Sequence, residues 1–270
     1  MPDGYRELAP PAPLRRALAC LWVRVVPADA AAPVRILPDA CSDLIWRSGT
    51  GAFVAGPDTG PVSGGATPGS VFVGARFRPG AGGPALAHPL HELRDRRVDV
   101  GDLLPALARR LDPGLTPAEA LRQVALAAAE LAQARPPDDL VGAAAQHLAD
   151  PRARSAAVAD ELGVSERHLR RRFHESVGYG PKTLHRVLRF RSFLGRLDAA
   201  DGDADLAGLA ADCGFADQAH LTRECSRLAG MSPAAIARER VGAPAAAGRV
   251  AYERRNSSTT FPVAPRESMS

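Results

Sequence analysis

Side chains that can hydrogen-bond to the edges of nucleic-acid bases stand in two short stretches of this chain of 270 residues. Arg167, Arg170 and Arg171 lie in the first, and a guanidinium group can donate two parallel hydrogen bonds to O6 and N7 of guanine. Gln218 and Arg223 lie in the second, and a glutamine amide can pair in a similar way with adenine. An arginine run is equally compatible with phosphate contact or with a solvated surface, so the elements that carry these residues decide their chemistry.

Both stretches belong to a repeated pattern. Residues 155–173 and 206–225 each contain an apolar-periodic helix, a glycine-centred turn and a second, more polar helix. Gly163 and Gly214 stand at the two turns, where a tight connection between helices needs a residue that tolerates positive φ. The pattern predicts two helix-turn-helix units about fifty residues apart, which could together hold two stretches of one DNA duplex.

Capping residues support the start of each second helix. Ser165 follows the first turn, and its hydroxyl can accept a hydrogen bond from a free N–H group of the first helical turn. Asp217 has the same role in the second unit, and its negative charge also suits the positive end of the helix.

A third helix is predicted between the two units, over residues 181–197. Pro181 suits the first turn of a helix, and apolar residues then keep a helical period to Leu197. Its 17 residues span about 26 Å, and successive major-groove faces of B-DNA lie roughly 34 Å apart. A rigid rod of this length, with the width of each unit added, could hold two recognition helices one turn of DNA apart.

With these elements in place, residues 151–240 resemble the dual helix-turn-helix domain of AraC/XylS-type bacterial transcription regulators. The matching strings are LGVSERHLRRRF, VGYGPKTLHRVLRF and CGFADQAHLTREC, followed by GMSP at 230–233. Residues 5–104 also resemble the sensor half of some of these regulators, through LPDACSDLIW, VGARFRPG and LHELRDRRVDVGDLL. The chain departs from the family pattern at Cys225, where Phe is usual, and in the acidity of residues 198–217.

The resemblance implies a set of DNA-contacting residues on the two recognition helices and the connecting helix. Those expected to contact bases are Arg167, Arg170, Arg171, Gln218 and Arg223. Those expected to contact phosphates are Ser165, Arg172, Lys182, Arg186, His220 and Thr222. His220 could equally be packed inside the protein.

Charge is unevenly distributed along the DNA-binding half. The whole chain carries a formal net charge of +4. Residues 151–197 hold 11 Lys/Arg against 4 acids, whereas residues 198–240 hold 4 Lys/Arg against 8 acids. The first unit and the connecting helix should therefore supply most of the attraction to phosphates, and the second unit should dock more weakly.

The front half has a different character. Short strand-like runs at Val34–Leu37, Asp43–Trp46 and Val71–Phe77 are separated by Gly/Pro clusters, a pattern typical of a β-rich fold such as a small barrel or sandwich. Before them, we expect an extended lead-in over residues 1–13 and a short amphipathic stretch from Leu14 to Leu21. Helical signals return at 102–111, 117–134 and 138–149.

Several features of the front half allow two interpretations. The Ala-rich helix over 117–134 could mediate dimerisation or simply cover the β core. Arg76 and Arg78 could bind an anionic ligand or be turn residues, and Asp39 and Asp43 look like turn caps. The aromatic residues could line a pocket, although in a β domain we favour a core. They are Trp22, Trp46, Phe53, Phe72 and Phe77.

A metal- or cysteine-dependent sensor is the rival class. Cys41 with His88 and His91 could offer sulfur and nitrogen ligands to zinc, but Pro89 separates the histidines and no fourth ligand is suitably spaced. A DNA-alkylation response protein would need a four-cysteine zinc site, whereas only Cys20 and Cys41 precede the DNA-binding half. No nucleophile elbow, P-loop or dinucleotide-binding glycine pattern occurs, so we expect no enzyme, no cofactor and no metal.

Together, the sequence predicts an α+β transcription regulator that binds double-stranded DNA in two adjacent major grooves. The expected parts are a sensor or dimerisation domain over 1–110, a helical linker region over 111–150, a DNA-binding domain over 151–240 and a disordered tail over 241–270. The resemblance implies control by a small-molecule effector or by self-association. It also implies contact with RNA polymerase and formation of a homodimer. No signal segment or long apolar run occurs, so we expect a cytoplasmic protein with reduced thiols and no membrane partner.

Overall fold

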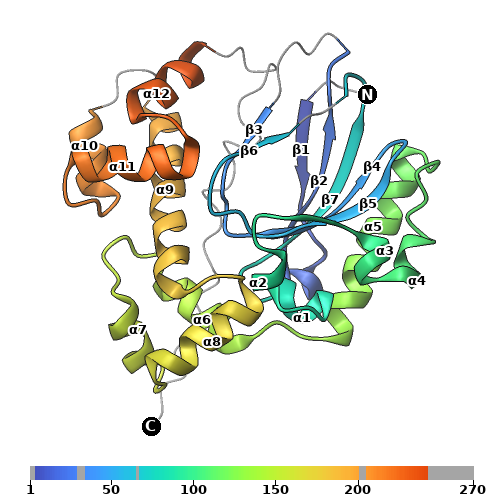
Figure 1. Cartoon of the computed structure of the whole chain (residues 1–270), viewed down its shortest axis with the longest axis horizontal. Helices are drawn as coiled ribbons and strands as arrows, with labels where there is room; N and C mark the ends of the chain where they lie inside the picture. Colours follow the sequence, from blue (N-terminus) through green and yellow to red (C-terminus); the bar gives the residue numbers. More distant parts are fainter. Residues whose placement is uncertain (1–3, 29–33, 65–66, 201–204, 243–270) are drawn as a thin grey trace.

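The computed structural model describes residues 4–28, 34–64, 67–200 and 205–242. It has a β-rich front half followed by an all-helical back half (Figure 1). The expected α+β class is therefore confirmed. The predicted disordered tail falls, from residue 243 onward, outside the described residues.

The front half is built on a six-stranded antiparallel sheet with the order β1-β2-β7-β4-β5-β8. Its strands are β1 (Gly4–Leu8), β2 (Leu18–Val25), β4 (Ser42–Arg47), β5 (Gly51–Ala55), β7 (Val71–Phe77) and β8 (Arg97–Asp99). The strands β1 and β8 form the two edges, so the sheet stays open and does not close into a barrel. A separate pair is formed by β3 (Val34–Ile36) and β6 (Val62–Gly64).

The start of the chain differs from the sequence prediction. The expected lead-in contains β1, which pairs along its whole length with β2. The second half of the expected amphipathic stretch from Leu14 to Leu21 belongs to β2, after a short 3-10 helix over Ala12–Leu14. Strand pairing with partners distant in sequence overrides the local pattern here.

One face of the sheet packs on helix α5 (Pro117–Ala134), and the other carries an aromatic cluster. The capping box of Thr116 and Glu119 starts α5. Its buried residues are Ala120, Val124, Ala127, Ala128 and Ala132. The helix therefore covers the β core, and dimerisation through it stays a prediction.

Gly74 makes room for the aromatic cluster on the opposite face. It lies opposite Trp22 in the strand pairing, and a Cβ atom built on Gly74 would lie 2.2 Å from the Trp22 indole. Trp22 packs with Ile45, Phe53 and other apolar side chains of this face, while Trp46 and Phe77 belong to the core on the α5 side. The core interpretation of the aromatics fits these contacts.

Short helices complete the front half, and seven helices follow in the described part of the back half. The short ones are α1 (Gly82–Leu86), α2 (Leu90–Leu93), α3 (Val100–Leu103) and α4 (Pro105–Ala108). The back half holds α6 (Asp139–His147), α7 (Ser155–Glu161), α8 (Glu166–Ser176), α9 (Pro181–Ala199), α10 (Leu206–Asp212), α11 (Gln218–Ala229) and α12 (Pro233–Gly242). Among the described residues, no helix is long and apolar enough to cross a membrane.

The two hydrophobic cores divide the predicted linker region between them. Helix α5 contributes to the core of the front half, whereas Val141 and Leu148 at α6 belong to the core of the back half. Leu37 and Ala40, which precede β4, also pack into the back-half core. The domain limits at residues 110, 150 and 240 stay predictions.

Candidate nucleic-acid interface

The first helix-turn-helix unit consists of α7, a turn at Gly163 and α8. Gly163 has φ of +67°, which places it in the left-handed region. The Ser165 hydroxyl accepts a hydrogen bond of 3.2 Å from the backbone N–H of His168, and this bond caps α8. Leu169 and Phe173 of α8 are buried in the back-half core. The turn and the cap are therefore formed as predicted.

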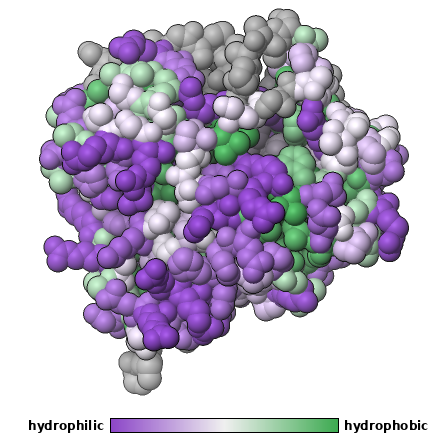
Figure 2. Space-filling view, in the orientation of Figure 1, coloured by the Kyte–Doolittle hydropathy of each residue, from purple (hydrophilic) through white to green (hydrophobic). Residues whose placement is uncertain are grey.

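The three predicted base-contacting arginines are accessible. Arg167, Arg170 and Arg171 are exposed on α8. The Arg171 side chain is 59% exposed and forms an ion pair of 3.2 Å with Glu175, one helical turn further on. Figure 2 shows that hydrophilic side chains dominate the surface over α8 and around α11. Base contact by these arginines stays a prediction, but nothing in the described part of the chain covers them.

Arg172 has a partner inside the protein. Its Nε lies 2.7 Å from Oδ2 of Asp138, whose side chain is only 3% exposed. Asp138 also caps α6 and accepts a hydrogen bond of 3.2 Å from the Ser176 hydroxyl. This pairing raises the pKa of Arg172 and ties α8 to the start of α6. Phosphate contact by Arg172 would have to compete with that ion pair.

The second unit repeats the first, with α10, a turn at Gly214 and α11. Gly214 has φ of +73°, and a Cβ atom there would lie 2.4 Å from the carbonyl oxygen of Pro151. Only glycine satisfies both constraints. The Asp217 carboxylate accepts a hydrogen bond of 2.5 Å from the backbone N–H of His220, which confirms Asp217 as the N-cap.

Side chains on α11 differ in their availability to DNA. Gln218 and Arg223 are exposed, as base contact would require. The Thr222 hydroxyl donates a hydrogen bond of 2.9 Å to the Gln218 carbonyl. The His220 ring accepts a hydrogen bond of 3.2 Å from the Ala216 N–H and meets Phe215 edge-on at 5.4 Å. His220 therefore helps to pack the turn, and its Nδ1 is not free for phosphate.

The connecting helix α9 holds the two units together. Figure 1 shows α8 crossing one end of α9 and α11 crossing it nearer the other end. Lys182 is exposed at the start of α9, whereas Arg186 faces α11, with its Nε 2.8 Å from a Glu224 carboxylate oxygen. The 19 residues of α9 give a rod of about 29 Å.

The front half touches both units. Helices α1 and α2 pack on α8, where a Cβ atom on Gly83 would lie 2.4 Å from the carbonyl oxygen of Glu175. The His91 and His174 rings meet there at 6.3 Å between centroids. At the other unit, a Cβ atom on Gly230 at the end of α11 would lie 3.5 Å from Pro61, and Arg35 of β3 pairs with Glu239 of the following helix α12 at 3.1 Å.

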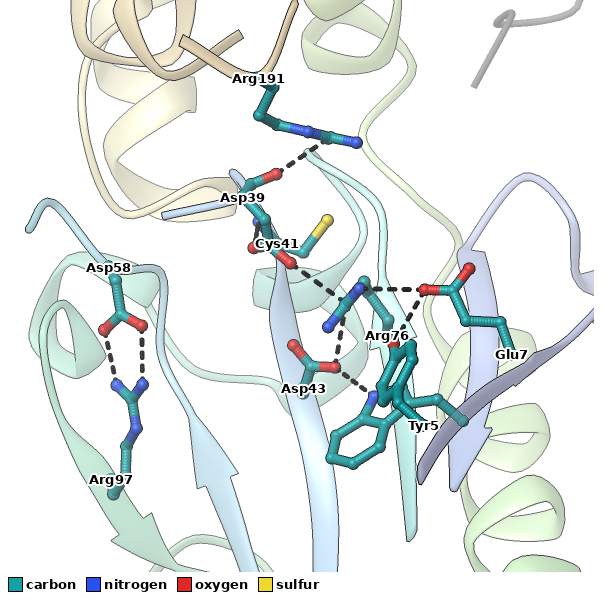
Figure 3. A network of polar contacts seen from close by, with 10 residues as sticks. Tyr5, Glu7, Asp39, Cys41, Asp43, Asp58, Arg76, Arg97 and Arg191 are labelled. Carbon is teal, nitrogen blue, oxygen red and sulfur yellow. Dashed lines mark hydrogen bonds and ion pairs between the residues drawn. The ribbon is translucent and has the colours of Figure 1, made fainter. Parts of the chain in front are cut away.

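A buried polar network lies where the sheet meets the back half (Figure 3). Arg76 is at its centre, with Glu7 at 3.4 Å and both Asp39 and Asp43 at 3.2 Å. The Trp22 indole donates a hydrogen bond of 2.7 Å to Asp43. Arg76 is therefore a buried strand residue, and its guanidinium group already forms ion pairs with three carboxylates. The suggested turn role is wrong for Arg76 and also for Asp43, which is a buried residue of β4.

Asp39 connects this network to α9. Its carboxylate caps the turn by accepting a hydrogen bond of 2.9 Å from the Cys41 N–H, which fits the predicted turn role. Its main-chain carbonyl accepts a hydrogen bond of 3.0 Å from Arg191 of α9. Sequence reasoning missed this link, as it missed Asp138 and Glu224, because a single sequence shows a buried acid but not its distant partner.

The residues proposed for zinc have other contacts. His88 lies 3.1 Å from Glu92, and His91 meets His174. Within the described ranges, no group of three or more His, Cys, Asp or Glu side chains could hold a metal ion. Burial raises the pKa of all four thiols, whereas a reactive cysteine needs a lowered pKa. No observation favours the zinc- or cysteine-dependent alternative.

Two protein families match the chain. A family described as "Helix-turn-helix domain" matches residues 158–239, and a "Domain of unknown function (DUF6597)" matches residues 6–99. No curated protein sequence matches the chain.

Solved structures of ToxT from Vibrio cholerae show a distant similarity. One has 11% identity and a TM-score of 0.43, and the match covers 89% of this chain and 99% of that one. Another, with an unsaturated fatty acid bound, has 14% identity and a TM-score of 0.41, with 80% and 94% covered. Likenesses this weak carry no information about ligands or residue roles.

Proposed function

We propose that the chain binds specific DNA sequences through α8 and α11 in adjacent major grooves, using an AraC-type helix-turn-helix domain that follows a domain of unknown function. The matched helix-turn-helix domain supports a role as a transcription regulator. The proposal covers binding in two grooves, the residues that contact DNA and the means by which binding is controlled.

The observation that carries this proposal is the arrangement of exposed side chains on two capped helices held by one rod. Arg167, Arg170 and Arg171 are exposed on α8, and Gln218 and Arg223 are exposed on α11. Both helices pack on α9, which fixes the distance between them. The rod of about 29 Å, together with the width of the units, suits major-groove faces roughly 34 Å apart.

Control by the front half is supported by its contacts with both units. Helices α1 and α2 pack on α8, Arg35 contacts α12, and Asp39 joins the Arg76 network to α9. An effector or a second copy that altered the sheet would therefore act on elements that set the relation between α8 and α11. We also propose, from the family resemblance, that the protein contacts RNA polymerase and forms a homodimer.

Selection of bound duplexes from a random DNA pool, followed by footprinting, tests the proposal. We expect one enriched sequence with two protected half-sites whose centres lie about 10 base pairs apart on one side of the duplex. A scaffold that binds only protein would enrich nothing. A single protected half-site would contradict the two-groove mode while leaving DNA binding intact.

A further inference from the structure

Three arginines on one side of α9 contact the second helix-turn-helix unit. Arg186, Arg189 and Arg196 are spaced by three and seven residues, so they lie along one stripe of the helix. Arg196 reaches Asp212 at the end of α10, at 3.3 Å. This pair is exposed, with 50% and 61% of the two side chains accessible, and exposed pairs contribute little to stability. The other two contacts are more buried.

Arg186 holds the recognition helix itself. Its Nε lies 2.8 Å from Oε2 of Glu224, and the side chains are 30% and 10% exposed. That oxygen has no aligned hydrogen-bond donor, so the contact is an ion pair whose strength depends on charge and distance. A carboxylate this buried is costly without a nearby cation. Glu224 therefore favours the one position of α11 that keeps it beside Arg186.

Arg189 holds the turn that precedes the recognition helix. Its Nη1 donates a hydrogen bond of 2.8 Å to the carbonyl of Gly214. Its guanidinium also lies over the Phe215 ring, 5.1 Å from the centroid. Arg186 thus fixes α11 itself and Arg189 fixes the turn that leads into it, and two such points set the angle of a helix against its support.

The same contacts account for the acidity of the second unit. Every acidic residue of 198–240 that the structure describes either forms an ion pair with an arginine or caps a helix. Asp198 pairs with Arg240, Asp212 with Arg196, Glu224 with Arg186 and Glu239 with Arg35, while Asp205 and Asp217 cap α10 and α11. Asp212 and Glu224 therefore hold the unit on α9, and the other described acids cap helices or pair with arginines of β3 and α12.

We infer that Arg186 and Arg189 are positioning residues that set the angle of α11 and thereby the spacing of the two half-sites that the protein accepts. This inference rests on the proposed two-groove function. It also reassigns Arg186, which the sequence predicts to contact phosphate. Neither arginine needs to touch DNA for this role.

The test measures binding of the full-length protein to duplexes that carry both selected half-sites at different spacings. Each added base pair rotates the second half-site by about 35° around the duplex. We expect the wild-type protein to prefer one spacing by roughly tenfold, the size of a single mismatch. Arg189→Lys, which keeps the charge but cannot reproduce the stacked geometry, should accept neighbouring spacings within about threefold.

Arg186→Gln should relax the spacing preference in the same way, and the exchange Arg186→Glu with Glu224→Arg should restore part of it. Arg196→Gln is the matched control on the same stripe and should keep the wild-type preference. Base preference within each half-site should stay unchanged in all variants, because none of these side chains reads bases.

Three results would overturn the inference. An unchanged spacing preference in both Arg186→Gln and Arg189→Lys would show that other contacts set the angle. Loss of the second half-site at every spacing would indicate a purely structural role, and equal weakening of both half-sites would indicate phosphate contact. A wild-type protein that selects no DNA would instead refute the proposed function, so the two failures are distinguishable.

Discussion

Arg191 on α9 donates a hydrogen bond of 3.0 Å to the main-chain carbonyl of Asp39, which lies just before β4. The Asp39 carboxylate also lies 3.2 Å from Arg76 in the sheet, so one residue contacts both halves of the molecule. The next residue, Ala40, has φ of +70°, a strained conformation for a residue other than glycine. Surrounding contacts must hold this turn in place, and the back-half core that buries Ala40 supplies them.

The network beside this turn should make stability depend on pH through Asp43. Burial raises the pKa of Asp43 to about 6 from its usual 3.8, although Arg76 opposes the rise. Because the folded pKa is the higher one, the folded state favours the protonated acid. The contribution of Asp43 to stability is therefore full below about pH 4 and is lost as the pH rises through about 6.

Asp43→Asn lacks this titration while keeping an oxygen that can accept from Trp22. We expect the stability of the wild type relative to Asp43→Asn to fall by on the order of 1–3 kcal/mol as the pH rises from about 4 to 7. Urea unfolding of both proteins at several pH values measures the difference. A difference that grew with pH would mean that Arg76 outweighs burial.

Substitution of Gly74 tests the packing of the aromatic face. Alanine usually stabilises a strand interior relative to glycine, by roughly 0.5–1 kcal/mol. Here the new Cβ atom would lie 2.2 Å from the Trp22 indole, and overpacking costs about 1–3 kcal/mol. The steric cost should win, so Gly74→Ala should be destabilised and its tryptophan fluorescence altered.

Gly142→Ala is the matched control. Gly142 lies inside α6, and a Cβ atom there would meet nothing within 4 Å. We expect this variant to gain about 0.4–1 kcal/mol in thermal unfolding. Equal effects at both glycines would argue against the close approach of Trp22 to Gly74.

Local signals in the sequence were sufficient to predict the turns and helix caps of the two units, but not the contacts that support these units. Gly163, Gly214, Ser165 and Asp217 follow from conformational and capping preferences that act within a few residues, and the structure confirms all four. The strand over Val71–Phe77 also matches its predicted limits. Such features need no knowledge of the tertiary fold.

Contacts between distant segments could not be predicted in this way. In the sequence, Arg172 and Arg186 resemble surface cations, but each pairs with a buried acid that is distant along the chain. Arg172 pairs with Asp138, 34 residues away, and Arg186 pairs with Glu224, 38 residues away. The strand β1 likewise depends on pairing with β2. A signal for Glu224 was present, since it stands beside buried Leu221 and Cys225 on α11. It shows burial but does not identify the cation.

The four cysteines should be unreactive in the native protein. All are buried, and burial raises the pKa of each thiol, to about 12 for Cys225. The thiolate is the reactive species, so a thiol reagent such as DTNB should label the native protein far more slowly than the urea-unfolded protein. Rapid labelling of one native cysteine would revive the cysteine-dependent sensor.

Lys182 should contribute to DNA affinity without affecting sequence preference. It is exposed at the start of α9 and could release one counterion on binding a phosphate. Lys182→Ala should weaken binding to all sequences alike and reduce the slope of log K against log salt by about 0.9. Titrations at several salt concentrations measure the slope. A changed base preference would assign Lys182 to a different role.

Arg171 should read one base directly. Its ion pair with Glu175 is exposed and worth about 0.3–0.5 kcal/mol, whereas a two-point contact with guanine is worth about 1–3 kcal/mol. Arg171 can therefore leave Glu175 when DNA binds. Arg171→Ala should lose about 1–3 kcal/mol of specific affinity and accept any base at one position of the first half-site.

Glu175→Gln provides the control for this prediction, because it removes the partner of Arg171 and leaves the arginine in place. We expect its base preference to match the wild type, with slightly tighter binding because a negative charge near the phosphates has gone. Binding-site selection with both variants gives the comparison at every position. If Arg171→Ala selects the same sequence as the wild type with unchanged affinity, Arg171 does not contact a base, and Arg167 and Arg170 become the candidates on α8.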